Sequence, residues 1–111
     1  MAIQSTNLSN VPLAISPSSA SDLAVTVMFF CNLNTPDPLD DTIGRQFLDI
    51  YVVKSGDTTS TTNIVAKQVP VDANDTFTFS AERLVLSPGD RIWATTTNAT
   101  QESVTVSYVI I

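Results

Sequence analysis

The sequence predicts an all-β fold, a single two-sheet antiparallel sandwich or jelly roll of about seven or eight strands. Segments rich in β-branched residues recur at roughly ten-residue spacing, separated by turns containing Pro, Gly, Asn or Asp. No window of about eleven residues or more has the apolar spacing of an amphipathic helix. The chain of 111 residues has room for one core, and we expect residues 1–22 to form an N-terminal arm or edge strands and residues 23–111 the β-sandwich domain.

The first strands are expected at residues 2–6 and 11–15. Pro12 fits an edge strand because proline donates no hydrogen bond to a neighbouring strand. The longest strand should cover residues 23–31. Strict alternation along it places Leu23, Val25, Val27, Phe29 and Cys31 on one face and Ala24, Thr26, Met28 and Phe30 on the other.

A long irregular loop is expected at residues 32–45, which contain two prolines, three aspartates and a glycine. Strands should follow at residues 47–54 and 63–71, joined by a polar, Thr-rich tip, and residues 72–75 should form an Asx-rich turn. The next strand, residues 76–81, alternates cleanly, with three side chains directed inward, and after a short break it is followed by two leucines. The inward side chains are Phe77, Phe79 and Ala81, and the two leucines are Leu84 and Leu86.

The segment Ser87-Pro88-Gly89-Asp90 predicts a type II turn, in which proline supplies the fixed φ and glycine the positive φ. We expect this turn to set the register between residues 84–86 and the strand that starts at Arg91. In that strand Ile92 and Ala94 should face inward and Trp93 outward. The chain should end in a hairpin of residues 91–96 and 103–111, with Val104, Val106, Tyr108 and Ile110 facing the core.

Charge and composition exclude several classes of partner. The net charge is −6, with only five Lys and Arg residues, and nucleic-acid affinity depends on cations that neutralise phosphates. The same charge disfavours an anionic membrane surface. No apolar segment approaches the ~20 residues of a membrane span, and the first thirty residues lack the pattern of a signal peptide. We expect neither nucleic acid nor membrane as a partner.

No catalytic, cofactor-binding or metal site is expected. Histidine is absent, there is one cysteine, and three glycines cannot build a phosphate-binding loop. Two acidic clusters contain calcium-type ligands, but turn and capping roles explain both better. The second of them also lacks the glycine and the closing glutamate of an EF-hand loop, where Arg83 stands instead. The clusters are Asp37, Asp40 and Asp41, and then Asp72, Asn74 and Asp75.

The apolar side chains predict self-association, because both faces of residues 23–31 are apolar and few charges oppose contact. Met28 and Phe30 are the interface candidates on that strand, and Trp93 is a third. Trp93, Tyr51 and Tyr108 could instead form a flat aromatic platform for a sugar, although packing is the commoner role of such residues.

Four segments in this order resemble small β-sandwich virion proteins of tailed bacteriophages, over about residues 23–111. They are MFFCN at 28–32, LDIYVV at 48–53, LVLSPGDRI at 84–92 and VTVSYVII at 104–111.

The resemblance implies a non-enzymatic structural protein of a phage virion, one that decorates or cements the capsid or forms part of the tail, baseplate or fibre. Its partners would be copies of itself and other virion proteins. It would be assembled into the virion in the cytoplasm of the bacterial host. The loop at residues 32–45 is longer than the resemblance predicts. The alternative is a glycan- or host-receptor-binding module, which the same sandwich can support.

Overall fold

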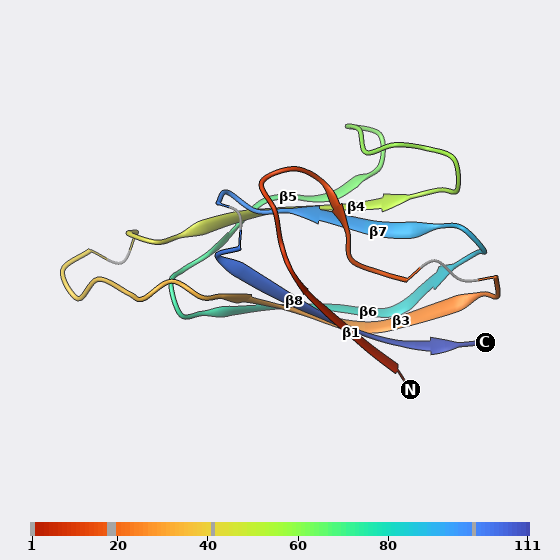
Figure 1. Cartoon of the computed structure of the whole chain (residues 1–111), viewed down its shortest axis with the longest axis horizontal. Helices are drawn as coiled ribbons and strands as arrows, with labels where there is room; N and C mark the ends of the chain where they lie inside the picture. The colour runs from red at the N-terminus through yellow and green to blue at the C-terminus, as the bar shows by residue number, and fades with distance from the viewer. Residues whose placement is uncertain (1, 18–19, 41, 99) are drawn as a thin grey trace.

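The protein is an eight-stranded β-sandwich in a computed structural model that describes residues 2–17, 20–40, 42–98 and 100–111. Its two antiparallel sheets pack face to face (Figure 1): sheet I has the order β1-β8-β3-β6 and sheet II the order β2-β7-β4-β5. The predicted all-β class is confirmed. The strands are β1 Ala2–Asn7, β2 Leu13–Ala14, β3 Leu23–Asn32, β4 Gln46–Val53, β5 Ile64–Val71, β6 Thr76–Leu86, β7 Arg91–Thr95 and β8 Glu102–Ile110.

The strand pairing is that of a jelly roll. β1 pairs with β8, β2 with β7, β3 with β6 and β4 with β5, so the chain is one long antiparallel ribbon folded at its middle. Rolling up this ribbon brings β8 against β3 and β7 against β4. Only β4 and β5 are consecutive strands of one sheet, and every other connection crosses between the sheets.

Two expected hairpins are therefore wrong. The predicted tight turn is present, because the Asp90 N–H donates to the Ser87 carbonyl at 3.0 Å and Gly89 has a φ of +88°. It joins β6 of sheet I to β7 of sheet II, however, and β7 and β8 also lie in different sheets. The physical reason is that a tight polar turn between alternating strands suits an arch between sheets as well as a hairpin within one.

The face assignment in β3 is wrong beyond Thr26. A β-bulge between Val25 and Val27 inserts one residue relative to β8 and reverses the alternation. Met28 and Phe30, only 1% and 0% exposed, therefore lie in the core with Leu23 and Val25, whereas Val27 and Phe29 face outward. The core also contains Leu8, Ile15, Leu48, Ile50, Val71, Leu86, Ile92, Ala94, Val104 and Val106.

The segment 1–22 supplies edge strands to both sheets, because β1 borders sheet I and β2 borders sheet II. Its side chains Leu8 and Ile15 are buried in the shared core. Tyr108 packs against the core as expected, but Ile110 is 61% exposed. The prediction for Ile110 fails because the described pairing of β8 with β1 ends at Tyr108, so among the described residues no strand lies beside Ile110 on that side. Its partner on the other side, Leu23 of β3, is buried.

Strand β6 runs without the expected break, and Phe77 and Phe79 pack against the core as predicted. The side chain of Ala81 lies outside the described part of the chain.

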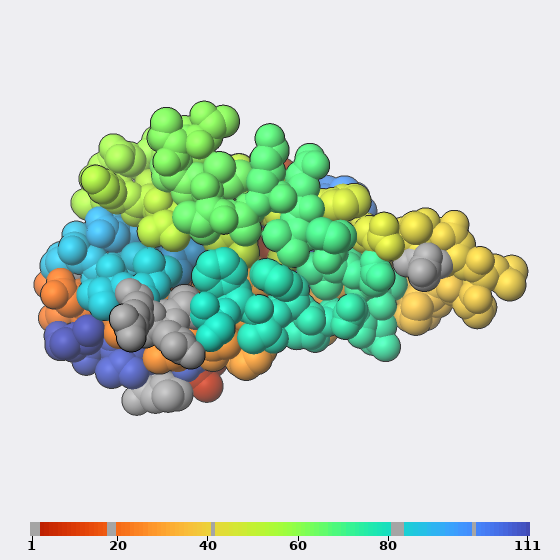
Figure 2. All heavy atoms as spheres, turned by 180° about the vertical axis from the view of Figure 1, so that it is seen from behind, coloured from red at the N-terminus to blue at the C-terminus, as the bar shows by residue number. Residues whose placement is uncertain are grey.

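The segment between β3 and β4 forms no regular strand and extends away from the sandwich (Figures 1 and 2). Its base is fixed by amides, since Asn32 Nδ2 donates to the carbonyls of Gly44 and Val71, both at 2.8 Å. Asn34 Nδ2 donates to the same Gly44 carbonyl at 2.8 Å. The molecule measures 48 × 29 × 20 Å, with this loop at one end of its longest dimension.

Two glycines with the same backbone conformation allow a matched test of the β6–β7 turn. Gly56 and Gly89 have φ of +86° and +88°, but a Cβ at 56 meets nothing within 4 Å, whereas a Cβ at 89 lies 2.5 Å from Ser55 Oγ. Gly56→Ala should cost about 1 kcal/mol of unfolding free energy through backbone strain alone. Gly89→Ala should cost about 2–3 kcal/mol, because the clash adds to that strain. Chemical denaturation measures both, and equal losses would contradict the contact with Ser55.

Candidate functional site

The aromatic residues singled out by the sequence separate into two groups. Trp93 and Tyr51 are cross-strand partners on β7 and β4, both half-buried on the outer face of sheet II. Ile92 and Ala94 face inward beside Trp93, as predicted. Tyr108 lies in sheet I, so the three rings do not form one platform. The interface candidates Met28 and Phe30 are core residues and present no surface to a partner in this structure.

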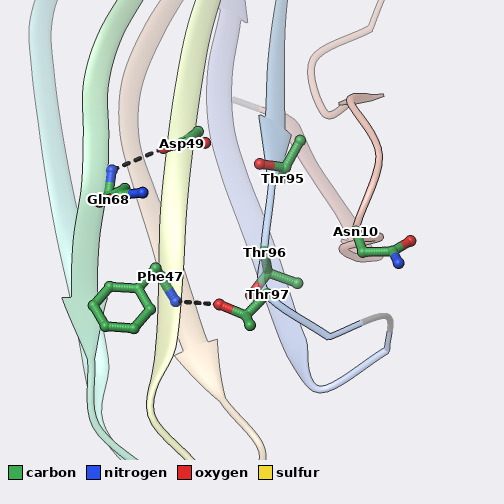
Figure 3. Close-up of a pocket in the computed structure, with 7 residues that line it drawn as sticks. All are labelled: Asn10, Phe47, Asp49, Gln68, Thr95, Thr96 and Thr97. Carbon is green, nitrogen blue, oxygen red and sulfur yellow. Dashed lines mark hydrogen bonds between the residues drawn. The ribbon is translucent and has the colours of Figure 1, made fainter.

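A pocket of about 440 Å³ lies on the outer face of sheet II (Figure 3). Strand alternation explains part of its lining, because positions 47, 49 and 51 of β4 all project from this face. Figure 3 shows that β5, β4, β7 and the loop after β1 contribute side by side. The lining residues are Asn10, Phe47, Asp49, Gln68, Thr95, Thr96 and Thr97.

Two hydrogen bonds hold the walls of this pocket (Figure 3). The Gln68 N–H donates to Asp49 Oδ1 at 2.8 Å, and the Phe47 N–H donates to Thr97 Oγ1 at 2.9 Å. Gln68 has a φ of +51° where the β4–β5 register shifts, a conformation that is uncommon for a residue other than glycine. No described residue bonds to Asp49 Oδ2, to the Gln68 amide or to the Thr95 hydroxyl, so these groups are free to meet a ligand.

Sequence reasoning missed this pocket, and the signal was weak. Its members are spread over four separate segments, and only the strand pairing brings them together. The one local indication was Asp49, a carboxylate in phase with Phe47 and Tyr51 on an otherwise apolar strand.

A buried polar cluster lies at the end of the sandwich from which the long loop extends. Gln46, Thr96 and Glu102 are all buried. Thr96 Oγ1 lies 3.0 Å from Gln46 Oε1 and 3.3 Å from Glu102 Oε2, and the Asn98 N–H donates to Gln46 Oε1 at 2.8 Å. Gln46 Nε2 and Glu102 Oε1 have no partner among the described residues. Because Thr96 also lines the pocket, the cluster adjoins the pocket floor.

The neutral form of Glu102 suits this cluster. Burial raises the pKa of Glu102 to about 7, against the opposing effect of the hydrogen bond from Thr96. Thr96 has a single hydroxyl proton and cannot donate to both of its neighbours. A protonated Glu102 donates to Thr96 Oγ1, which leaves the threonine proton for Gln46. In the sequence, Glu102 alternates in phase with Val104 and Val106 of β8, and this spacing was the signal that its carboxyl faces the core.

The acidic clusters are occupied by turn interactions. Asp37 Oδ1 accepts the Leu39 N–H at 2.8 Å, and Asp40 Oδ1 accepts the N–H and hydroxyl of Thr42 at 2.9 and 2.7 Å. These bonds hold the pKa of the Asp40 carboxyl below its usual value. Asp41 lies outside the described residues.

In the second acidic cluster, Asp72 pairs with Arg45, and the Asp75 N–H donates to the Asp72 carbonyl at 3.0 Å across a turn in which Asn74 has a φ of +64°. Nowhere in the described part of the chain do three or more His, Cys, Asp or Glu side chains gather as they would around a metal ion.

The outer face of sheet I is a second candidate surface. Cross-strand pairing aligns it in rows, and its middle row contains Phe29 between Thr105 and Thr78. Twelve described positions on these rows hold no charged residue, and we call this set of positions the uncharged face. It consists of Ile3, Ser5 and Asn7 from β1, Ser103, Thr105 and Ser107 from β8, Val27, Phe29 and Cys31 from β3, and Thr76, Thr78 and Ser80 from β6.

The fold and these surfaces define the class of protein as a small jelly-roll sandwich with a polar pocket on one outer face and an uncharged surface on the other. No protein-family model and no curated protein sequence matches the chain. Within the described ranges, no helix is long and apolar enough to cross a membrane.

Glu102 predicts a specific dependence of stability on pH. Between about pH 4.5 and 7 the carboxyl is neutral in the folded chain and ionised in the unfolded chain. Unfolding then releases a proton, and stability falls as the pH rises through this range. Glu102→Gln removes the cost of ionising a buried carboxyl. The free energy of unfolding of the variant should therefore exceed that of the parent by about 3 kcal/mol at pH 8 and by little at pH 4. Denaturation at both pH values measures this, and the same difference at both would contradict a buried neutral carboxyl.

Proposed function

We propose that this protein is a non-enzymatic structural subunit of a phage virion. In this role it packs on the exterior of the capsid or tail, next to copies of itself and other virion proteins. The observation that carries the proposal is the uncharged face of sheet I. The fold agrees with this role, because jelly rolls occur among capsid proteins. Jelly rolls also occur among lectins, so the uncharged face supports the role more specifically than the fold does.

The uncharged face has the chemistry of an interface. The chain contains 16 charged residues, since it has five Lys and Arg and eleven Asp and Glu, yet none of the twelve positions named above is charged. This statement covers the side chains that the structure describes, which on β6 exclude positions 81–83. Interface centres are depleted in charged residues and enriched in aromatic ones. Phe29 is 43% exposed in the middle row, and the short Ser and Thr side chains around it allow the close approach of a second flat surface.

The loop between β3 and β4 supports the same role. It projects from the body of the sandwich (Figure 2), and three of its apolar side chains are exposed to solvent. Leu39 is 95% exposed, and Leu33 and Ile43 are also exposed. Apolar side chains on a projecting arm are costly in water and gain free energy when a neighbouring subunit covers them. The loop can therefore act as an arm that reaches an adjacent subunit.

Replacing Phe29 tests this proposal, with a matched control on the opposite sheet. Phe47 is also 43% exposed but projects from sheet II. The parent should associate at high protein concentration in sedimentation velocity, and Phe29→Lys should abolish association because the charge must be desolvated at the interface. Phe47→Lys should associate like the parent.

The particle role has its own measurement. A virion subunit occurs at a fixed ratio to the other proteins of purified particles, which quantitative mass spectrometry determines. A parent protein that stays monomeric at every concentration and is absent from particles would refute the proposal.

A further inference from the structure

We infer that the pocket of Phe47 and Asp49 on sheet II binds a neutral saccharide. This inference goes beyond the proposed assembly role, which uses sheet I and the long loop. It assigns a separate ligand to the opposite face of the same domain, so each face has one function.

Aromatic and polar groups alternate along β4, from Phe47 and Asp49 in this pocket to Tyr51 in the adjoining one. In β4, Phe47, Asp49 and Tyr51 project from one face, so a carboxylate lies between two rings, and Trp93 lies beside Tyr51 on β7. The apolar C–H face of a pyranose packs on an exposed aromatic ring, whereas its hydroxyls require hydrogen bonds at the ring edge. Phe47 and Asp49 are two residues apart on β4, so a single sugar ring can contact both the aromatic ring and the carboxylate.

The polar groups of the pocket match hydroxyls in particular. Asn10 and Gln68 offer amide donors and acceptors, Thr95 offers a hydroxyl, and Asp49 Oδ2 is an acceptor with no partner among the described residues. Sugar hydroxyls both donate and accept, so they suit this mixture. Asp49 is fixed through Oδ1 by the Gln68 N–H at 2.8 Å, so its second oxygen is already oriented for a ligand.

The charge of the lining selects a neutral ligand. Among the described residues that line this pocket, Asp49 is the only ionisable one. A phosphate, sulfate or uronate in this pocket would meet a carboxylate and no cation of the described lining, on a chain of net charge −6. The nearby cation, Lys67, belongs to the adjoining pocket. A metal ion would find one carboxylate where hard cations need six or more oxygen ligands. The polar lining equally disfavours an apolar ligand.

The size of the site suits an oligosaccharide. The pocket volume of about 440 Å³ lies in the range of ligand pockets, roughly 300–1,000 Å³. A second pocket of about 360 Å³ shares Asp49 and extends past Tyr51 to Thr61 and Lys67. A chain of sugar units can therefore continue along β4 from Phe47, across Asp49, to Tyr51.

A glycan array that carries neutral and sialylated oligosaccharides tests the ligand class. The full chain should bind neutral glycans and not their sialylated counterparts. Absence of binding to every neutral glycan, or binding restricted to sialylated ones, would overturn the inference.

Titration with the best soluble oligosaccharide from the array then tests the residues, because it reports the affinity of each subunit regardless of assembly. Phe47→Ala and Asp49→Asn should each weaken binding by about tenfold or more. Asp49→Asn keeps an oxygen that accepts the Gln68 N–H, and thermal melts establish that each variant is folded. Phe29→Ala, equally exposed at 43% on sheet I, should bind like the parent.

Unchanged affinity in both site variants would also overturn the inference. The two functions fail separately, because the Phe47 and Asp49 variants should still associate, whereas Phe29→Lys should lose association and keep saccharide binding.

Discussion

The β-bulge at Thr26 determines which apolar residues of β3, the central strand of sheet I, lie in the core and which lie on the surface. β3 is hydrogen-bonded to β8 on one side and β6 on the other, so its alternation governs the centre of sheet I. The Thr26 hydroxyl donates to the Ser107 carbonyl at 3.0 Å and anchors the extra residue. Without this residue, Phe29 would turn inward and Phe30 outward. One inserted residue thus fills the core and also leaves an aromatic ring in the middle of the uncharged face.

The jelly-roll connectivity then gives the two sheets different outer surfaces. Because nearly every connection crosses between the sheets, each sheet combines strands that are distant in sequence. The uncharged face of sheet I combines positions from four strands, whereas Phe47, Asp49, Tyr51 and Trp93 project from the outer face of sheet II, where Lys67 lies near Asp49. The outer edge of sheet II is also protected against pairing with other strands, because β5 carries Lys67, Pro70 and a shifted register.

Local patterns predicted the fold class and most strand positions, because each strand has its own alternation and each turn its own residues. The inward Ile92 and Ala94 and the positive φ of Gly89 follow from such local rules. The bulge at Thr26 and the arch at Gly89 do not, because an extra residue leaves an apolar run looking regular and a tight turn does not reveal which sheet follows. The pocket required the complete pairing, since the loop after β1 and three strands line it.

Three departures from the usual rules of folding lie near the pocket on sheet II. Gln68 has positive φ without being glycine, Phe47 exposes an aromatic ring, and Glu102 buries a carboxyl. Each feature lowers stability: Gln68 through backbone strain, Phe47 through exposed apolar surface and Glu102 through incomplete hydrogen bonding. Thr96 connects them, because it lines the pocket and contacts Glu102. Proteins tolerate such costs mainly at functional sites, and here all three lie in or next to the pocket that we propose as the saccharide site, where Thr96 links the pocket lining to the buried carboxyl of Glu102.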